Sequence, residues 1–95
     1  MYEHAPSCVH AKLVLTNTLG LHARAAAAVV QALQGLQADV TVSWAGQTAN
    51  GRSILELLTL GAPQGSVLEV RATGPDAEAA VAALTRVVEN RFYEE

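Results

Sequence analysis

The sequence has few of the residues that small secreted proteins and aromatic-rich cores depend on. Its 95 residues include one cysteine, and aromatic residues make up 4% of the chain. The single thiol, Cys8, cannot form an internal disulfide, which excludes a disulfide-stapled scaffold and favours a reducing compartment. The hydrophobic residues make up 51% of the chain, so the core must be built mainly from Ala, Val and Leu. A chain of this length is expected to form one domain.

Positive charge and long apolar runs are scarce as well. Six basic residues stand against nine acidic ones, for a formal net charge of −3. Proteins that bind nucleic acid or anionic membranes usually carry a basic face, so neither partner is expected. No apolar run is long enough for a membrane span, and the start at Met1 lacks the basic and apolar regions of a signal peptide. We therefore expect a cytoplasmic protein without membrane insertion.

The sequence also lacks the side-chain sets of common enzymes. We find no paired carboxylates and no nucleophile with a base and an orienting acid. The spacing of His4, Cys8 and His10 could suggest a metal site, but histidines near a terminus more often decorate the surface. Cys8 has no Cys-x-x-Cys partner either. No metal or cofactor is expected, and an independent catalyst is the least favoured reading.

Hydropathy patterns divide the chain into strands and helices. Residues 9–16 alternate apolar and polar positions as a half-buried strand does, and residues 40–44 and 67–72 repeat that pattern. A short strand near Thr48 follows a turn at 45–47. Helices are predicted at 23–36, from Ser53 to about Gly61, and from Pro75-Asp76-Ala77-Glu78 onward, where the proline suits the first turn. Their expected core positions are Ala26, Val30, Leu33, Leu57, Leu60, Ala80, Leu84, Val87 and Val88.

The resulting order, β-α-β-β-α-β-α, predicts an α+β fold. We expect a two-layer open-faced sandwich, in which a four-stranded antiparallel sheet carries three helices on one face. Residues 1–8 are expected to form a short flexible extension, residues 9–92 the single domain, and residues 93–95 a tail.

His22 is the most informative residue, because it stands where a turn at residues 17–20 becomes an Ala-rich helix. A helix start has unpaired N–H groups and a partial positive charge, which together favour an anion. Arg24 adds a fixed cation whose planar head suits phosphate oxygens. A neutral imidazole is a nucleophile, and both positive features should favour that neutral form. A phosphoryl-accepting histidine is one interpretation; a cap or a solvated surface residue is the more common role of a histidine at this place.

The second helix begins with Ser53-Ile54-Leu55-Glu56, which fits a capping box. In that motif the serine oxygen and the glutamate carboxylate each accept a backbone N–H at the other's position. Ser53 is therefore expected to be the N-cap of this helix.

The segment Gly20-Leu21-His22-Ala23-Arg24-Ala25-Ala26 resembles the active-site motif G-L-H-x-R-P-A of HPr proteins, the bacterial phosphocarriers of the phosphoenolpyruvate-dependent sugar phosphotransferase system. The resemblance continues through residues 50–55, 58–61 and 64–67, and covers about 9–88 in one register. It implies the HPr-like fold. It also implies that His22 is phosphorylated on Nδ1 and that Arg24 steadies the phosphoryl group.

The resemblance further implies partners and a docking surface. Phosphorylated Enzyme I would be the donor, and an EIIA-type domain of a sugar permease the acceptor. Ser53 resembles a regulatory serine that a dedicated kinase phosphorylates, and a transcription regulator is then a further partner. The residues expected to face these partners are Leu21, Ala23, Ala27, Arg52, Ile54, Leu55 and Leu58. A carrier that presents one face to several proteins is expected to be a monomer.

The chain departs from the family pattern at Ala25, where proline is usual, and at Gln31 and Gln34, where lysine is frequent. Ala25 adds an N–H donor and puts the stiffness of the site in doubt. The two glutamines leave Arg24 and Arg52 as the main nearby cations, which should weaken steering toward an acidic partner. Alternatives therefore stay open: a carrier of a nitrogen-related or dihydroxyacetone kinase branch, a regulatory module acting through Ser53, or an interaction domain without the chemistry.

Overall fold

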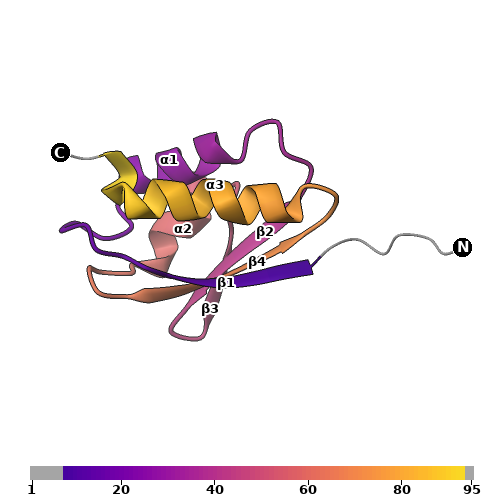
Figure 1. Cartoon of the computed structure of the whole chain (residues 1–95). Helices are drawn as coiled ribbons and strands as arrows, with labels where there is room; N and C mark the ends of the chain where they lie inside the picture. Colours follow the sequence, from indigo (N-terminus) through magenta and orange to yellow (C-terminus); the bar gives the residue numbers. More distant parts are fainter. Residues whose placement is uncertain (1–7, 94–95) are drawn as a thin grey trace, which may run out of the picture.

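The computed structural model describes residues 8–93. Its strands are β1 (Cys8–Val14), β2 (Asp39–Trp44), β3 (Gln47–Asn50) and β4 (Val67–Thr73). Its helices are α1 (Ala23–Ala32), α2 (Ile54–Leu60) and α3 (Ala77–Glu89), followed by a short 3-10 turn, η1 (Arg91–Tyr93). Figure 1 shows the helices lying on one side of the sheet. The predicted two-layer α+β sandwich and its element order are confirmed.

The predicted extension and tail fall largely outside the described residues. Of residues 1–8 only Cys8 is described, and it already belongs to β1, one residue before the predicted start. Of residues 93–95 only Tyr93 is described, as the last residue of η1. None of the helices within 8–93 is long and apolar enough to cross a membrane.

The four strands form one antiparallel sheet in the order β1-β4-β2-β3. Along β4 the alternation is clear: Leu68, Val70 and Ala72 are buried, whereas Glu69 and Arg71 are exposed. Successive side chains of a strand point to opposite faces, so the first set packs under the helices and the second lies on the open face. The sheet is therefore solvated on one side, as predicted.

Small and medium aliphatic residues fill the space between sheet and helices. Leu57, Leu60, Ala80, Leu84, Val87 and Val88 are buried as predicted. In α1 the buried stripe is Ala25, Ala26 and Val29, whereas Val30 is only half-buried. Val30 still packs against the core, and Ala26 and Leu33 are fully buried, so the predicted stripe is confirmed with Val30 at its edge.

Helix α1 also ends earlier than predicted, at Ala32 instead of Leu36. The N–H groups of Leu33, Gln34 and Leu36 donate to carbonyls three residues back, at 3.2 Å each. This tighter pattern is that of 3-10 turns, which often close a helix. Gly35 lies within this closing turn, at φ +82°.

Two connections show that α1 and α2 run antiparallel. Leu21 N, just before α1, donates to the oxygen of Ala62, just after α2, at 2.9 Å. At the other end, Arg52, just before α2, donates to the oxygen of Leu33, just after α1, at 2.8 Å. His22 and Ser53 therefore lie at opposite ends of this helix pair.

Candidate functional site

His22 is the N-cap of α1. Its backbone is extended (φ −88°, ψ −175°), and its side chain makes no capping hydrogen bond. The backbone carries the helix start instead: the oxygen of His22 accepts from Ala26 N at 2.8 Å, and its N–H donates to the oxygen of Gly20 at 3.0 Å. His22 is half-buried, its main chain is fixed by these two bonds, and its ring is not used to cap the helix.

The loop before His22 is fixed by Asn17 and Gly20. The buried Asn17 side chain (1% exposed) donates from Nδ2 to the oxygen of Gly20 at 2.7 Å. Gly20 has φ +65°, and a Cβ there would lie 2.8 Å from Pro63 Cα and closer still to the oxygen of Ala62. Only glycine fits this approach. The turn was predicted from the sequence but the burial of Asn17 was not; an asparagine opening a four-residue turn is the signal that could have indicated it.

The first turn of α1 leaves backbone donors available. The N–H groups of Arg24 and Ala25 make no hydrogen bond to any residue between 8 and 93, because the helix ladder begins at Ala26. Arg24 is exposed, and its side chain makes no ion pair or hydrogen bond within that range. The side chain of Ala25 is wholly buried. A histidine, two backbone donors and a guanidinium therefore share one helix start, which suits an anion attached to the ring.

The structure buries one expected docking residue, Leu21, and places the exposed Arg52 away from His22. Leu21 is 4% exposed and packs in the core, because the Leu21–Ala62 hydrogen bond draws this segment against the end of α2. Arg52 donates from its guanidinium to the oxygens of Leu33, Leu36 and Ala38. Its head group thus closes the C-terminal end of α1, about 15 Å along the helix from His22. It is not a cation beside His22.

The start of α2 confirms one prediction and corrects another. Ser53 is the N-cap, and its Oγ accepts from Glu56 N at 3.1 Å. The capping box is incomplete, however, since Glu56 Oε1 accepts from Asn50 N at 2.8 Å and not from Ser53. The carboxylate reaches back past the cap to tie β3 to α2.

Apolar side chains remain exposed on α2 and before α1. Ile54, Leu55 (71% exposed) and Leu58 face solvent, whereas Leu57 and Leu60 on the same helix are core residues. Leu19 is 66% exposed in the loop before His22, which sequence analysis did not single out. Ala23 is exposed and Ala27 half-buried on α1. We call Leu19, Ile54, Leu55 and Leu58 the apolar patch.

Candidate metal ligands do not gather in the described part of the chain. No group of three His, Cys, Asp or Glu side chains there could hold a metal ion. Cys8 and His10 do approach one another, with Sγ 3.5 Å from Nε2; His4 lies outside the described residues.

Known proteins resemble this chain over most of its length. The sequence model of the family described as "PTS HPr component phosphorylation site" matches residues 9–90. Phosphocarrier protein HPr of Xylella fastidiosa (strain 9a5c) is 44% identical over 84 residues, which cover 88% of this chain and 94% of that protein. Phosphocarrier protein NPr of Escherichia coli (strain K12) is 38% identical over 82 residues, covering 85% and 91%.

Solved structures agree with this. A crystal structure of HPr-C-His from Thermoanaerobacter tengcongensis superposes with a TM-score of 0.86 at 34% identity, covering 92% of this chain and 98% of that one. An HPr from Bacillus anthracis superposes with a TM-score of 0.80 at 33% identity, covering 86% and 98%. The fold, the sequence match and the relatives agree, and the chain belongs to the HPr family of phosphocarrier proteins of the phosphotransferase system.

Proposed function

We propose that this chain accepts a phosphoryl group on His22 from phosphorylated Enzyme I and passes it to an EIIA-type domain. The observation that carries the proposal is the start of α1, where the His22 ring does not cap the helix while the N–H groups of Arg24 and Ala25 have no acceptor among residues 8–93. The carrier takes part in the transfer but does not turn over a substrate by itself, and it works in the cytoplasm as a monomer.

The transfer needs one nucleophilic nitrogen and groups that stabilise the negative charge of the phosphoryl oxygens. The lone pair of the neutral His22 ring attacks phosphorus, a P–N bond forms, and the bond that held the phosphoryl group to Enzyme I breaks with its electron pair returning to the donor. The family resemblance assigns the attacking atom as Nδ1, and the proton already on the other ring nitrogen stays there. The N–H groups at the helix start and the Arg24 guanidinium then face the phosphoryl oxygens. Transfer to the acceptor reverses these steps.

The test is the intact mass of the chain after incubation with Enzyme I, magnesium and phosphoenolpyruvate. A single phosphate adduct that survives alkali and is lost in acid is expected, since a phosphoramidate has that stability. His22→Ala should abolish the adduct, and His10→Ala, a matched change on β1, should leave it intact. An adduct that persists in His22→Ala would contradict the assignment.

The apolar patch, formed by Leu19 before His22 and the exposed side chains of α2, is proposed as the partner surface. Exposed apolar side chains that no other element covers often mark an interface. Leu55→Ala should leave the free energy of unfolding almost unchanged but slow transfer from Enzyme I. Leu57→Ala, two residues away but buried, should instead cost about 2–5 kcal/mol of stability. Equal transfer rates for Leu55→Ala and the unmodified chain would remove Leu55 from the interface.

Ser53 is proposed as a second, regulatory phosphorylation site for a serine kinase and its phosphorylase. Because Ser53 and His22 lie at opposite ends of the α1–α2 pair, a phosphate on Ser53 would act on partner binding and not on the His22 ring directly. Ser53→Asp should weaken Enzyme I binding and alter the choice of partner, including a transcription regulator. Unchanged binding of Enzyme I to this variant would argue against regulation at Ser53.

A nitrogen-related branch is the second candidate for the pathway. The exposed, neutral Gln31 and Gln34 on the α1 side favour it, as does the similarity to NPr. Transfer rates from the sugar-branch Enzyme I and from its nitrogen-branch counterpart, measured side by side, distinguish the two. A marked preference for the nitrogen-branch donor would overturn the sugar-branch assignment.

A further inference from the structure

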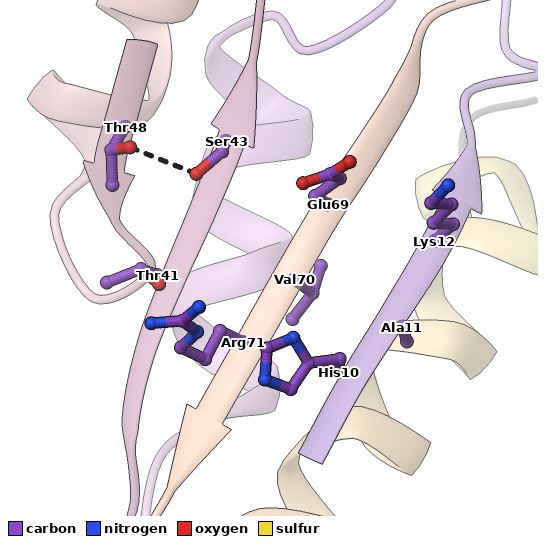
Figure 2. Close-up of a pocket in the computed structure, with 9 residues that line it drawn as sticks. All are labelled: His10, Ala11, Lys12, Thr41, Ser43, Thr48, Glu69, Val70 and Arg71. Atoms are coloured by element: carbon purple, nitrogen blue, oxygen red, sulfur yellow. Dashed lines mark hydrogen bonds between the residues drawn. The ribbon is translucent and has the colours of Figure 1, made fainter. Parts of the chain in front are cut away.

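The open face of the sheet carries a polar hollow that the transfer chemistry does not use. It is open to solvent, has a volume of about 690 Å³ and is lined by residues of all four strands: His10, Ala11, Lys12, Thr41, Ser43, Thr48, Glu69, Val70 and Arg71 (Figure 2). Small-molecule sites fall in this range of volume. We propose that this hollow binds a small phosphorylated polyol, with one phosphate and several hydroxyl groups.

The strand register arranges the polar side chains in two parallel rungs. In the first, Arg71 on β4 is the register partner of His10 on β1 and of Thr41 on β2. In the second, Glu69 is the partner of Lys12 and of Ser43, which in turn pairs with Thr48 on β3. The rungs are two residues apart along each strand, or about 6.7 Å. A small polyol phosphate has a comparable length from phosphorus to its far hydroxyl group.

The first rung suits the phosphate. The Arg71 guanidinium presents a planar set of donors and lies between the His10 ring and Thr41 in Figure 2. An arginine can bind two phosphate oxygens at once, and a histidine nitrogen and a threonine hydroxyl can each take part in a further hydrogen bond. Lys12, on the same face of β1, can reach the same anion with its flexible stem.

The second rung suits hydroxyl groups. Ser43 Oγ and Thr48 Oγ1 lie 3.0 Å apart and share a hydrogen bond, so each retains capacity for another partner. The Glu69 carboxylate accepts hydrogen bonds from hydroxyls but repels a second phosphate. This arrangement favours a monophosphate over a ligand phosphorylated at both ends.

The charges of the hollow are unusual for this molecule. Lys12 and Arg71 against Glu69 give a formal charge of +1 among the lining residues, on a chain of −3. Although Glu69 stands between the two cations, no ion pair or hydrogen bond engages the head groups of Lys12, Glu69 or Arg71 within the described part of the chain. One carboxylate cannot neutralise both cations, which leaves the face attractive to a single anion.

The experiment is a titration of the ¹⁵N-labelled full chain with glycerol 3-phosphate, inorganic phosphate and glycerol, followed by amide chemical shifts. Glycerol 3-phosphate should move the amides of both rungs, with a dissociation constant of about a millimolar. Inorganic phosphate should move only the first rung and bind more weakly, and glycerol should move neither. Inorganic phosphate binding as tightly as glycerol 3-phosphate would refute a polyol site.

Arg71→Gln and Arg86→Gln form the matched pair of variants, because both remove one charge from an exposed position. The first should weaken glycerol 3-phosphate binding about tenfold, since a charged hydrogen-bonding partner is lost. The second, on α3, should leave it unchanged. If both variants weakened glycerol 3-phosphate binding equally, the binding would depend only on the overall charge of the protein. Chemical-shift changes confined to residues 20–26 would place the anion at the start of α1. Either result overturns the proposal.

Glu69→Gln tests the second rung separately. It should reduce the preference for glycerol 3-phosphate over inorganic phosphate, while both still bind. A short acidic peptide that displaces glycerol 3-phosphate at lower concentration would show that the face binds protein and would also overturn the proposal. None of these readouts depends on phosphorylation of His22.

Discussion

The N-termini of α1 and α2 differ in what accepts the hydrogen bonds of their first N–H groups. At α2 the protein satisfies its own donors: Ser53 Oγ accepts from Glu56 N, Glu56 accepts from Asn50 N, and Asn50 Oδ1 accepts from Arg52 N at 2.9 Å. At α1 the N-cap residue makes no side-chain capping bond. A helix start that is closed by its own side chains stabilises the fold, whereas one left open can bind a ligand.

The largest effect in this comparison is expected from Gly20→Ala. The added methyl group would meet the backbone of Ala62 and Pro63, and the residue would have to stay at positive φ. We expect a loss of about 3 kcal/mol in the free energy of unfolding, measured by urea denaturation. Gly35→Ala is the matched control, because Gly35 also has positive φ but a Cβ added there would have nothing within 4 Å. It should cost about 1 kcal/mol; equal losses would show that the close approach at Gly20 does not matter.

Arg24→Gln should weaken anion binding at the start of α1 without affecting the start of α2. Removing the charged donor should slow phosphoryl transfer to His22 about tenfold, in rapid-quench measurements with phosphorylated Enzyme I. Arg86→Gln makes the same charge change on α3 and should not alter the rate. The proposed role of Arg24 fails if both variants transfer alike.

Ser53→Ala removes the cap that distinguishes α2 from α1. The loss should be about 1 kcal/mol of stability, because the N–H of Glu56 is left without its acceptor. The amount of phosphate on His22 at saturation should not change. Ser53→Asp provides the control, since aspartate also caps a helix and should retain most of the stability. A fall in His22 phosphorylation in the alanine variant would mean that the two helix starts are coupled.

Ala25→Pro is expected to have the smallest effect. Proline removes one N–H at the start of α1, but that N–H makes no bond within the described residues, so the helix keeps its own ladder. Losing this single neutral donor should slow transfer about threefold. Ala25→Gly keeps the N–H and should transfer faster than the proline variant. Identical rates for the two would show that this donor does not contact the phosphoryl group.

Local patterns predicted the elements well, and contacts between distant segments explain what they missed. The alternation in β4 was readable because one face of the sheet is solvated. Gly61, in the left-handed conformation, ends α2 as expected. Arg52 was misplaced because its acceptors, Leu33 to Ala38, stand 14 to 19 residues away in the sequence. Spacing alone cannot show which carbonyls a guanidinium will reach.

In the candidate site, too, local features were predicted and those that depend on distant contacts were missed. His22 and Arg24 were identified from a local motif, and the helix start where they lie was predicted. The burial of Leu21 and the exposure of Leu19 were not, because both depend on how the loop packs against the end of α2. Single apolar residues in a loop give no periodic signal that tells core from surface.

The path of the chain has a practical consequence for handling the protein. The Arg91 guanidinium, in η1, donates to the oxygen of Thr16 at 3.2 Å, which places the last described residues beside the loop that leads to His22. Cys8, the first described residue, begins the strand at the other end of the molecule (Figure 1). A fluorophore or surface tether is therefore best joined at Cys8, at the end of the molecule away from the loop that leads to His22. One joined at Tyr93 would lie beside that loop instead.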